Sequence, residues 1–360
     1  MNLSIGIVGL PNVGKSTLFN ALLKRQAALA ANYPFATIDP NTGIVPVPDA
    51  RLAVLAKIVN TTVLKPATVE FVDIAGLVKG ASKGEGLGNK FLANIREVSL
   101  IAHVVRAFSD ENVIREGSVS PQEDKETIET ELLLADLATL EKQVAPKGSK
   151  EKELLFRWEV IEKLRQHVGQ GGAVRDVVTT PEEQAVARDL GLLTAKRTVF
   201  VVNVDEAQVK NQAQLANEYA AVLSVPADDI VIVSAKIESE LAVLSDEDQA
   251  LYLQDLGLEQ SGLERLAGKA YHLLGLQSFL TAGELEVRAW TITQGTFAPQ
   301  AAAVIHTDFE KKFIKAKVAS YDDFVALGGW KGVREAGKQR LEGKDYAMQE
   351  GDVVEFMIGG

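Results

Sequence analysis

The chain has 360 residues, of which 46% are hydrophobic and 24% charged, and its formal net charge is −11 at pH 7. This length suffices for two or three domains, and the composition is that of a soluble globular protein. The negative charge argues against a protein that coats nucleic acid, and the absence of cysteine excludes disulfides and thiolate metal sites. We find no secretory signal and no apolar run of the ~20 residues that a membrane span requires, so we expect a cytoplasmic protein without membrane contact.

The first predicted element is a buried strand at residues 3–10, which leads through GLPNVGKS (9–16) into a helix. In this phosphate-binding pattern, glycines let backbone N–H groups face the phosphates and the helix presents its positive end. Lys15 should reach the β- and γ-phosphates, and the Ser16 hydroxyl should bind Mg²⁺. The alternative is a glycine turn that merely reverses the chain. The residues expected to bind the nucleotide here are Asn12, Val13, Gly14, Lys15, Ser16 and Thr17.

A second buried strand, at 67–76, ends in the sequence FVDIAG. Asp73 can hold the Mg²⁺ through water, and the Gly76 amide can sense the γ-phosphate. Thr37 lies between these two motifs, where a mobile loop would add a hydroxyl ligand to the metal. The predicted metal ligands are therefore Ser16, Thr37 and Asp73, and Lys15 and Gly76 are predicted to act in catalysis.

Leu77 follows Gly76, at the position where many GTPases carry a glutamine that orients the attacking water. Leucine can neither donate nor accept a hydrogen bond, so another group must hold the water. The glycines of residues 79–91 indicate a loop that changes conformation around this site. The alternative is a flexible linker without a function.

A third strand, at 100–108, is separated from a fourth, at 197–204, by a long insertion. Apolar residues recur at helical spacing over 133–144 and again over 154–168, and PKGSKEK between them is a turn signal. We therefore predict an antiparallel helical hairpin at about residues 125–170. The helices could instead lie on the main core, but their charged flanks favour a projecting arm.

The fourth strand runs into NVDE (203–206), where a GTP-binding protein would place Asn-Lys-x-Asp to hold guanine. Val204 replaces the lysine and Glu206 replaces the aspartate. Because Glu206 is one methylene longer than aspartate, its bidentate grip on guanine should be misplaced, and discrimination should be lost steeply. Asn203 can still bond N7 and the 6-amino group of adenine. The residues therefore predict a base site that is not strictly specific for guanine.

A fifth strand is predicted at 229–235. The five predicted strands are short, apolar and separated by helical stretches, which indicates an α/β fold with a mainly parallel sheet covered on both faces. After residue 276 the pattern changes to β-rich runs with turns between them. We therefore divide the chain into a first domain at 1–276 and a small mixed β domain at 277–360.

Basic residues gather in the C-terminal domain. Lys315 and Lys317 are expected on one face of a strand, and with Lys311 and Arg288 they could form a patch that binds RNA phosphates. The alternative is an ordinary solvated sheet face.

Several motifs together resemble one family. They are GLPNVGKST (9–17), NYPFATIDPNTG (32–43), DIAGLVKGASKGEGLGNKFLANIRE (73–97), NVDE (203–206) and VRAWTI with IHTDFEKKFI (287–314). They are similar to those of the YchF subfamily of Obg-like ATPases, and the resemblance covers nearly the whole chain. It implies a Ras-like P-loop nucleotide domain with an inserted helical hairpin, followed by a C-terminal TGS domain of β-grasp type.

The resemblance also implies chemistry for several residues. It implies that ATP is preferred over GTP, that Leu77 is the family's hydrophobic replacement for the catalytic glutamine, and that Ser234 and Ala235 contact the base. In potassium-stimulated relatives an asparagine at the position of Asn12 helps hold a monovalent cation, which would assist catalysis by neutralising charge; an ordinary loop-stabilising asparagine is the alternative.

A loop histidine attributed to the family is not carried over, since Arg115 stands at the matching position. The histidines at 103, 167, 272 and 306 show no metal-ligand spacing, and His103 is expected in the core.

The predicted function is that of a slow ATP-hydrolysing switch that associates with the ribosome and regulates translation or a stress response. The family's association with ribosomes also favours RNA contact through the TGS domain or the hairpin. Two alternatives remain: a GTPase of the Obg type that tolerates Glu206, and a nucleotide-dependent binding module with negligible turnover.

Overall fold

The computed structural model describes residues 4–30, 41–74, 87–109, 120–146, 148 and 150–359. The chain forms two compact units, one of Met1–Val45 with Glu70–Leu266 and the other of Pro46–Val69 with Ala267–Gly360. The sequence did not indicate that residues 46–69 belong with the C-terminal sheet. That two separately folding domains meet between residues 276 and 277 stays a prediction. Within the described parts of the chain, no helix combines the length and the apolar character needed to span a membrane.

The first unit is built on a sheet with the strand order β2-β4-β1-β5-β6-β7. The pairs β1–β4, β1–β5, β5–β6 and β6–β7 are all parallel, as predicted. Every residue of β1 and β5 is buried, because helices cover both faces of a parallel sheet. The strands are β1 (Ser4–Val8), β2 (Thr42–Pro46), β4 (Thr68–Asp73), β5 (Leu100–Arg106), β6 (Arg197–Asn203) and β7 (Ile230–Val233).

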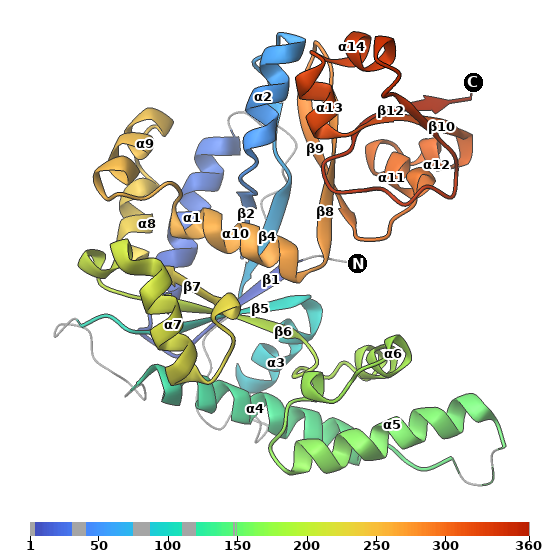
Figure 1. The fold of residues 1–360 in the computed structure, drawn as a ribbon. Helices are drawn as coiled ribbons and strands as arrows, with labels where there is room; N and C mark the ends of the chain where they lie inside the picture. The colour runs from blue at the N-terminus through green and yellow to red at the C-terminus, as the bar shows by residue number, and fades with distance from the viewer. Residues whose placement is uncertain are drawn as a thin grey trace. The chain divides into compact units, whose positions relative to one another are not determined.

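Helices connect these strands (Figure 1). The α-helices are α1 (Lys15–Ala30), α3 (Leu87–Glu97), α4 (Pro121–Glu141), α5 (Lys152–Gly169), α6 (Pro181–Asp189), α7 (Gln212–Leu223), α8 (Ala235–Leu241), α9 (Asp246–Asp255) and α10 (Gly262–Leu273). The 3₁₀ turns are η2 (Val174–Asp176), η3 (Glu206–Asn211) and η4 (Ala227–Asp229). α4 contacts β5 and α7, and α7 contacts β7.

The predicted hairpin is formed by α4 and α5, which contact each other (Figure 1). The residues before and at the start of α4 favour helix initiation: the N-cap Ser120 accepts a hydrogen bond from Glu123 N, and Pro121 occupies the first turn. Leu140, Ile161 and Leu164 form a small core of their own with residues of α6. Since α4 also contacts β5, the first part of the hairpin lies on the main sheet and the rest has a separate core.

The second unit has a mixed sheet with the strand order β11-β10-β12-β8-β9-β3. β12–β8 and β3–β9 are parallel, and the other described pairs are antiparallel. The strands are β3 (Leu64–Lys65), β8 (Leu276–Ala282), β9 (Val287–Thr293), β10 (Phe313–Ala319), β11 (Arg340–Glu342) and β12 (Val353–Ile358). The helices are α2 (Ala50–Val59), α11 (Ala298–Ile305), α12 (Asp308–Lys312), α13 (Tyr321–Ala326) and α14 (Trp330–Glu335).

The expected basic patch of the C-terminal sheet is not continuous. Ladder partners point to the same face, and from Lys317 across β12 and β8 this face includes Ala289 on β9. Arg288 is the neighbour of Ala289 in sequence, so it points to the face opposite Lys315 and Lys317. It stacks over Trp290, with 3.8 Å between the guanidinium carbon and the ring centroid, while Lys317 pairs with a carboxylate of β12. The prediction that Arg288 joins the two lysines was wrong, because sequence does not reveal the register across four strands.

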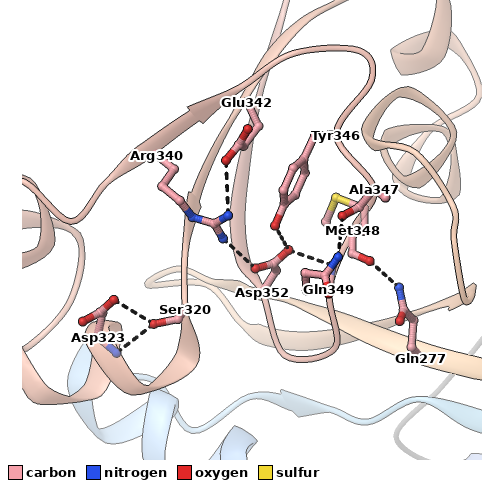
Figure 2. A network of polar contacts seen from close by, with 10 residues as sticks. All are labelled: Gln277, Ser320, Asp323, Arg340, Glu342, Tyr346, Ala347, Met348, Gln349 and Asp352. Carbon is pink, nitrogen blue, oxygen red and sulfur yellow. Dashed lines mark hydrogen bonds and ion pairs between the residues drawn. The ribbon is translucent and has the colours of Figure 1, made fainter.

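A buried carboxylate holds the end of this unit together (Figure 2). Asp352 is 3% exposed and accepts hydrogen bonds from Arg340 at 3.1 Å, from the Tyr346 hydroxyl at 2.7 Å and from Gln349 N at 2.9 Å. Burial and the hydrogen bond to Asp352 raise the pKa of Tyr346 to about 12. The network ties β11 to the turn before β12.

We expect Asp352→Ala to lower the free energy of unfolding of this unit by about 1–3 kcal/mol, because it leaves the partly buried Tyr346 hydroxyl and the Gln349 N–H without their acceptor and removes the partner of Arg340. Urea unfolding followed by tryptophan fluorescence in a Trp158→Phe background measures this, since the remaining Trp290 and Trp330 both lie in the second unit. Asp345→Ala, at an exposed aspartate nearby, is the matched control and should change the midpoint little. Equal midpoints for the two variants would show that the network adds no stability.

Candidate functional site

The residues singled out from the sequence meet at the carboxyl edge of the first sheet. The glycine loop follows β1, Asp73 ends β4, Asn203 ends β6 and Ser234 follows β7. Parallel strands all end at the same edge, which is where ligands bind in open α/β sheets. A cavity of about 370 Å³ opens on the loop, and its lining residues are Leu10, Pro11, Asn12, Gly14, Lys15, Ser16 and Thr17.

The loop adopts a conformation that depends on two positive φ angles. Gly14 has φ +97°, and a Cβ there would overlap Nδ2 of Asn203. Asn12 has φ 61°, which only glycine and a few residues such as asparagine adopt without much strain. The loop therefore turns tightly into α1, and the first N–H groups of that helix face the cavity region as an anion site requires.

Lys15 lies at the centre of the charge arrangement. Its Nζ is 2.9 Å from Oδ1 of Asp73, and Lys15 is 8% exposed. The predicted phosphate-binding lysine at the start of α1 and the predicted metal-binding aspartate at the end of β4 are thus in direct contact. Ser16 and Thr17 are exposed on the first turn of α1.

Asn203 links two loops of the site. It is 4% exposed, its Nδ2 donates to Val13 O at 3.0 Å, and its Oδ1 accepts from Ala235 N at 2.9 Å. The side chain thereby holds the phosphate loop against the segment that follows β7. Its amide nitrogen has two hydrogens, so one remains for a base.

The other two residues of the expected base site differ in exposure. Val204 is 2% exposed and packs in the core with Val105 and Val209, so it has no exposed side-chain surface for a base to contact. Glu206 is 39% exposed in its side chain, and its Oε1 lies 2.6 Å from Nζ of Lys236. Lys236 belongs to the segment VSAK (233–236), and no local sequence pattern indicates that it pairs with Glu206.

Four residues named from the sequence lie outside the described residues: Thr37, Gly76, Leu77 and Arg115. Ser234 is 3% exposed and precedes α8, beside Ala235. His103 is 1% exposed with its ring centroid 5.5 Å from that of Phe200, so its predicted place in the core is confirmed. Across the described ranges, no three acidic, histidine or cysteine side chains gather to hold a metal ion by themselves.

The chain is similar to known proteins over nearly its whole length. The family model YchF-GTPase_C, described as a protein of unknown function, matches residues 276–359, and the model MMR_HSR1, described as a 50S ribosome-binding GTPase, matches residues 4–153. The chain is 50% identical to the ribosome-binding ATPase YchF of Bacillus subtilis and 51% identical to that of Haemophilus influenzae, over 99% of each chain. The solved structure of the Schizosaccharomyces pombe YchF GTPase matches with a TM-score of 0.86 and 37% identity, over 99% of this chain and 98% of that one.

Proposed function

The chain belongs to the YchF family, and from this premise we propose that it is a cytoplasmic ATPase that binds the ribosome and acts as a slow nucleotide-dependent switch. Relatives about half identical over nearly their full length are named ribosome-binding ATPases. The single observation that carries the proposal is the tight loop at Gly14, which directs the start of α1 and Lys15 toward one cavity. RNA contact through the C-terminal domain or the hairpin is part of the same proposal.

Mg²⁺ fits the donor atoms at this cavity. A hydroxyl at Ser16 and a carboxylate at Asp73 are hard oxygen ligands, and Mg²⁺ takes few ligands from protein and the rest from phosphates and water. The absence of a three-carboxylate cluster among the described residues agrees with such a sparse site. When bound, the ion would neutralise charge on the phosphates. Ser16 and Asp73 would hold it, with Thr37 as a further proposed ligand.

Lys15 and Asp73 would exchange partners when Mg²⁺ and nucleotide bind. Their present ion pair of 2.9 Å neutralises the lysine that phosphates require and the carboxylate that the metal requires. Phosphate oxygens would accept the hydrogen bonds of the ammonium, and the freed carboxylate would face the ion. The Gly76 amide is proposed to contact the γ-phosphate.

Glu206 supports a preference for adenine. Its Oε1 pairs with Lys236 at 2.6 Å, and its side chain is one methylene longer than the aspartate that accepts both donors of guanine, so the bidentate contact should be misplaced. Asn203, fixed between Val13 and Ala235, keeps one N–H for the base, and Ser234 and Ala235 lie beside it. We therefore propose ATP as the preferred substrate.

A GTPase is the second candidate. The model that matches residues 4–153 is described as a GTPase, and so is the solved relative of 37% identity. The observation that favours this candidate is that Asn203, whose amide keeps one N–H, stands at the asparagine position of the guanine-binding motif.

We expect slow turnover by the isolated protein, on the order of 10⁻³ to 10⁻⁴ per second, as in unassisted Ras-like domains. Leu77 offers no hydrogen bond to water, so positioning and charge neutralisation must come from elsewhere. Ribosomes or K⁺ should therefore raise turnover several-fold. Single-turnover ATP cleavage in Na⁺ and in K⁺, with and without ribosomes, measures both effects. Fast cleavage by the bare protein in Na⁺ would contradict the proposal.

The K⁺ effect is expected to depend on Asn12. Asn12→Gly removes the side chain at a φ of 61° that glycine adopts freely, so it tests the amide without backbone strain. The increase in rate from Na⁺ to K⁺ should disappear. Asn60→Gly is the matched control, because Asn60 also has a left-handed φ of 56° but ends α2 in the second unit. Retention of the K⁺ effect in Asn12→Gly would assign the cation to other residues.

A further inference from the structure

A second and larger cavity lies in the first unit, away from the glycine loop. Its volume is about 600 Å³, within the range of small-molecule sites, and it shares no lining residue with the loop cavity. Ile101 and His103 at the start of β5, and Thr198 and Phe200 at the start of β6, line it. The glycine loop, Asp73 and Asn203 lie at the opposite, carboxyl edge of the same strands. We call it the α4 cavity, because the first turns of α4 form another wall.

The floor of the α4 cavity is largely apolar, and its polar groups include the Thr198 hydroxyl and the ring of His103. Register pairs His103 with Phe200, so both side chains point to the face that α4 contacts, where Ile128 and Leu132 of α4 complete the floor. His103 is 1% exposed, and among the described residues its Nε2 has no hydrogen-bond partner. Because Nε2 is itself buried, a molecule in the cavity would reach it only after a small shift of the ring, and the bond would remove the cost of a buried polar atom without a partner.

The charged wall of the cavity has a surplus of hydrogen-bond donors. Glu129 is shared by two cations, with Lys125 Nζ at 3.3 Å and Arg175 Nη2 at 2.9 Å. Lys125 is the least exposed of the three side chains, at 16%. One carboxylate cannot satisfy all the N–H groups of an ammonium and a guanidinium, so this trio keeps one net positive charge and unused donors. With Asp176, Arg197 and Asp229, the whole lining has three cations and three carboxylates, so the excess of positive charge is local to Lys125 and Arg175.

His103 adds a neutral hydrogen-bonding group. Burial, and to a lesser extent the charge of Lys125, lower the pKa of His103 to about 3. The imidazole is therefore uncharged at neutral pH and offers one donor and one acceptor nitrogen. Its lack of charge means that it neither repels nor attracts an anion electrostatically.

We propose that the α4 cavity is a binding site for a small organic anion, separate from the nucleotide site. The acid group contacts Lys125 and Arg175, the apolar body packs on Ile128, Leu132 and Phe200, and a polar atom of the molecule bonds Nε2 of His103. The cavity lies at the amino ends of β5 and β6, and the carboxyl ends of the same strands reach the nucleotide loops. A molecule bound in the cavity therefore contacts these strands without touching the nucleotide.

The test uses the full chain and 8-anilinonaphthalene-1-sulfonate, a fluorescent probe with aromatic rings and one negative charge. Titration in saturating MgADP keeps the nucleotide site blocked. We expect saturable binding that Lys125→Gln weakens about ten-fold, as the loss of a charge-assisted hydrogen bond predicts. Lys142→Gln, the same change at the far end of α4 outside the cavity lining, should leave binding unchanged.

A second readout follows the imidazole directly. The Nε2 resonance of His103, assigned by its loss in His103→Gln, should shift when the probe is added, and those of the other three histidines should not. Equal probe affinity in Lys125→Gln and wild type, displacement of the probe by MgADP, or an unmoved His103 resonance at saturation would each overturn the proposal.

Discussion

Replacement of Lys15 by alanine is expected to reduce ATP hydrolysis by about 10²- to 10³-fold or more and to weaken binding of the triphosphate. The lysine supplies a positive charge to the β- and γ-phosphates, and phosphoryl transfer depends almost entirely on positioning and charge stabilisation. Lys15 is 8% exposed and its ammonium lies 2.9 Å from Asp73, so no water or neighbouring side chain can replace it at low cost. Single-turnover cleavage and titration with a fluorescent ADP derivative measure the two effects.

The control for this change is Lys24→Ala. Lys24 lies on the same helix but is exposed, and it does not line the cavity. Its replacement should leave cleavage near the wild-type rate. If Lys15→Ala and Lys24→Ala hydrolysed ATP equally well, the glycine loop would not be the catalytic site.

Asn203→Ala is expected to have the next largest effect, on both stability and nucleotide binding. It removes the partners of Val13 O and Ala235 N, and a buried polar group left without a partner costs about 1–3 kcal/mol. We therefore expect the first unit to lose about 2–4 kcal/mol of unfolding free energy. Nucleotide affinity should fall as well, because the phosphate loop is no longer held against the segment after β7.

Two measurements separate this effect from a general loss of stability. Hydrogen exchange at the Ala235 amide should accelerate more than exchange in the middle of β6, and chemical denaturation gives the free energy. Asn217→Ala is the matched control, since Asn217 is exposed and bonds only Ala213 O in its own helix. An Ala235 amide that exchanges equally slowly in both variants would show that Asn203 does not hold the two loops together.

Much of the first unit was predictable because its signals are local. The glycine loop lies between a buried strand and a helix, and Asp73 and Asn203 stand at strand ends. Short apolar strands separated by helices leave few arrangements other than a parallel sheet, which brings all these strand ends to one edge. The meeting of Lys15 with Asp73 follows from that arrangement.

What the sequence could not supply was pairing between distant segments. Residues 46–69 carry local signals, such as the Asp49 cap of α2, but nothing in them shows that β3 pairs with β9, which lies more than 200 residues later in the chain. Whether Arg288 shares a face of the sheet with Lys315 and Lys317 depends on the register through β12 and β8, which no local pattern reveals.

The base site shows the same limit at a smaller scale. The motif placed Val204 and Glu206 in the base site, at the positions of the lysine and aspartate of GTP-binding proteins. The structure buries Val204 in the core and pairs Glu206 with Lys236, a residue 30 positions later. Burial is a tertiary property, so the motif alone could not separate the two roles.

The preference for ATP is the central claim, and competition with a fluorescent ADP derivative tests it most directly. Increasing ATP or GTP is added to the protein with the derivative bound, in Mg²⁺ and K⁺, and displacement is followed by fluorescence. Because Glu206 is paired with Lys236 and is too long for a bidentate grip on guanine, ATP should displace the derivative at the lower concentration. Displacement by GTP at an equal or lower concentration than ATP would contradict the account.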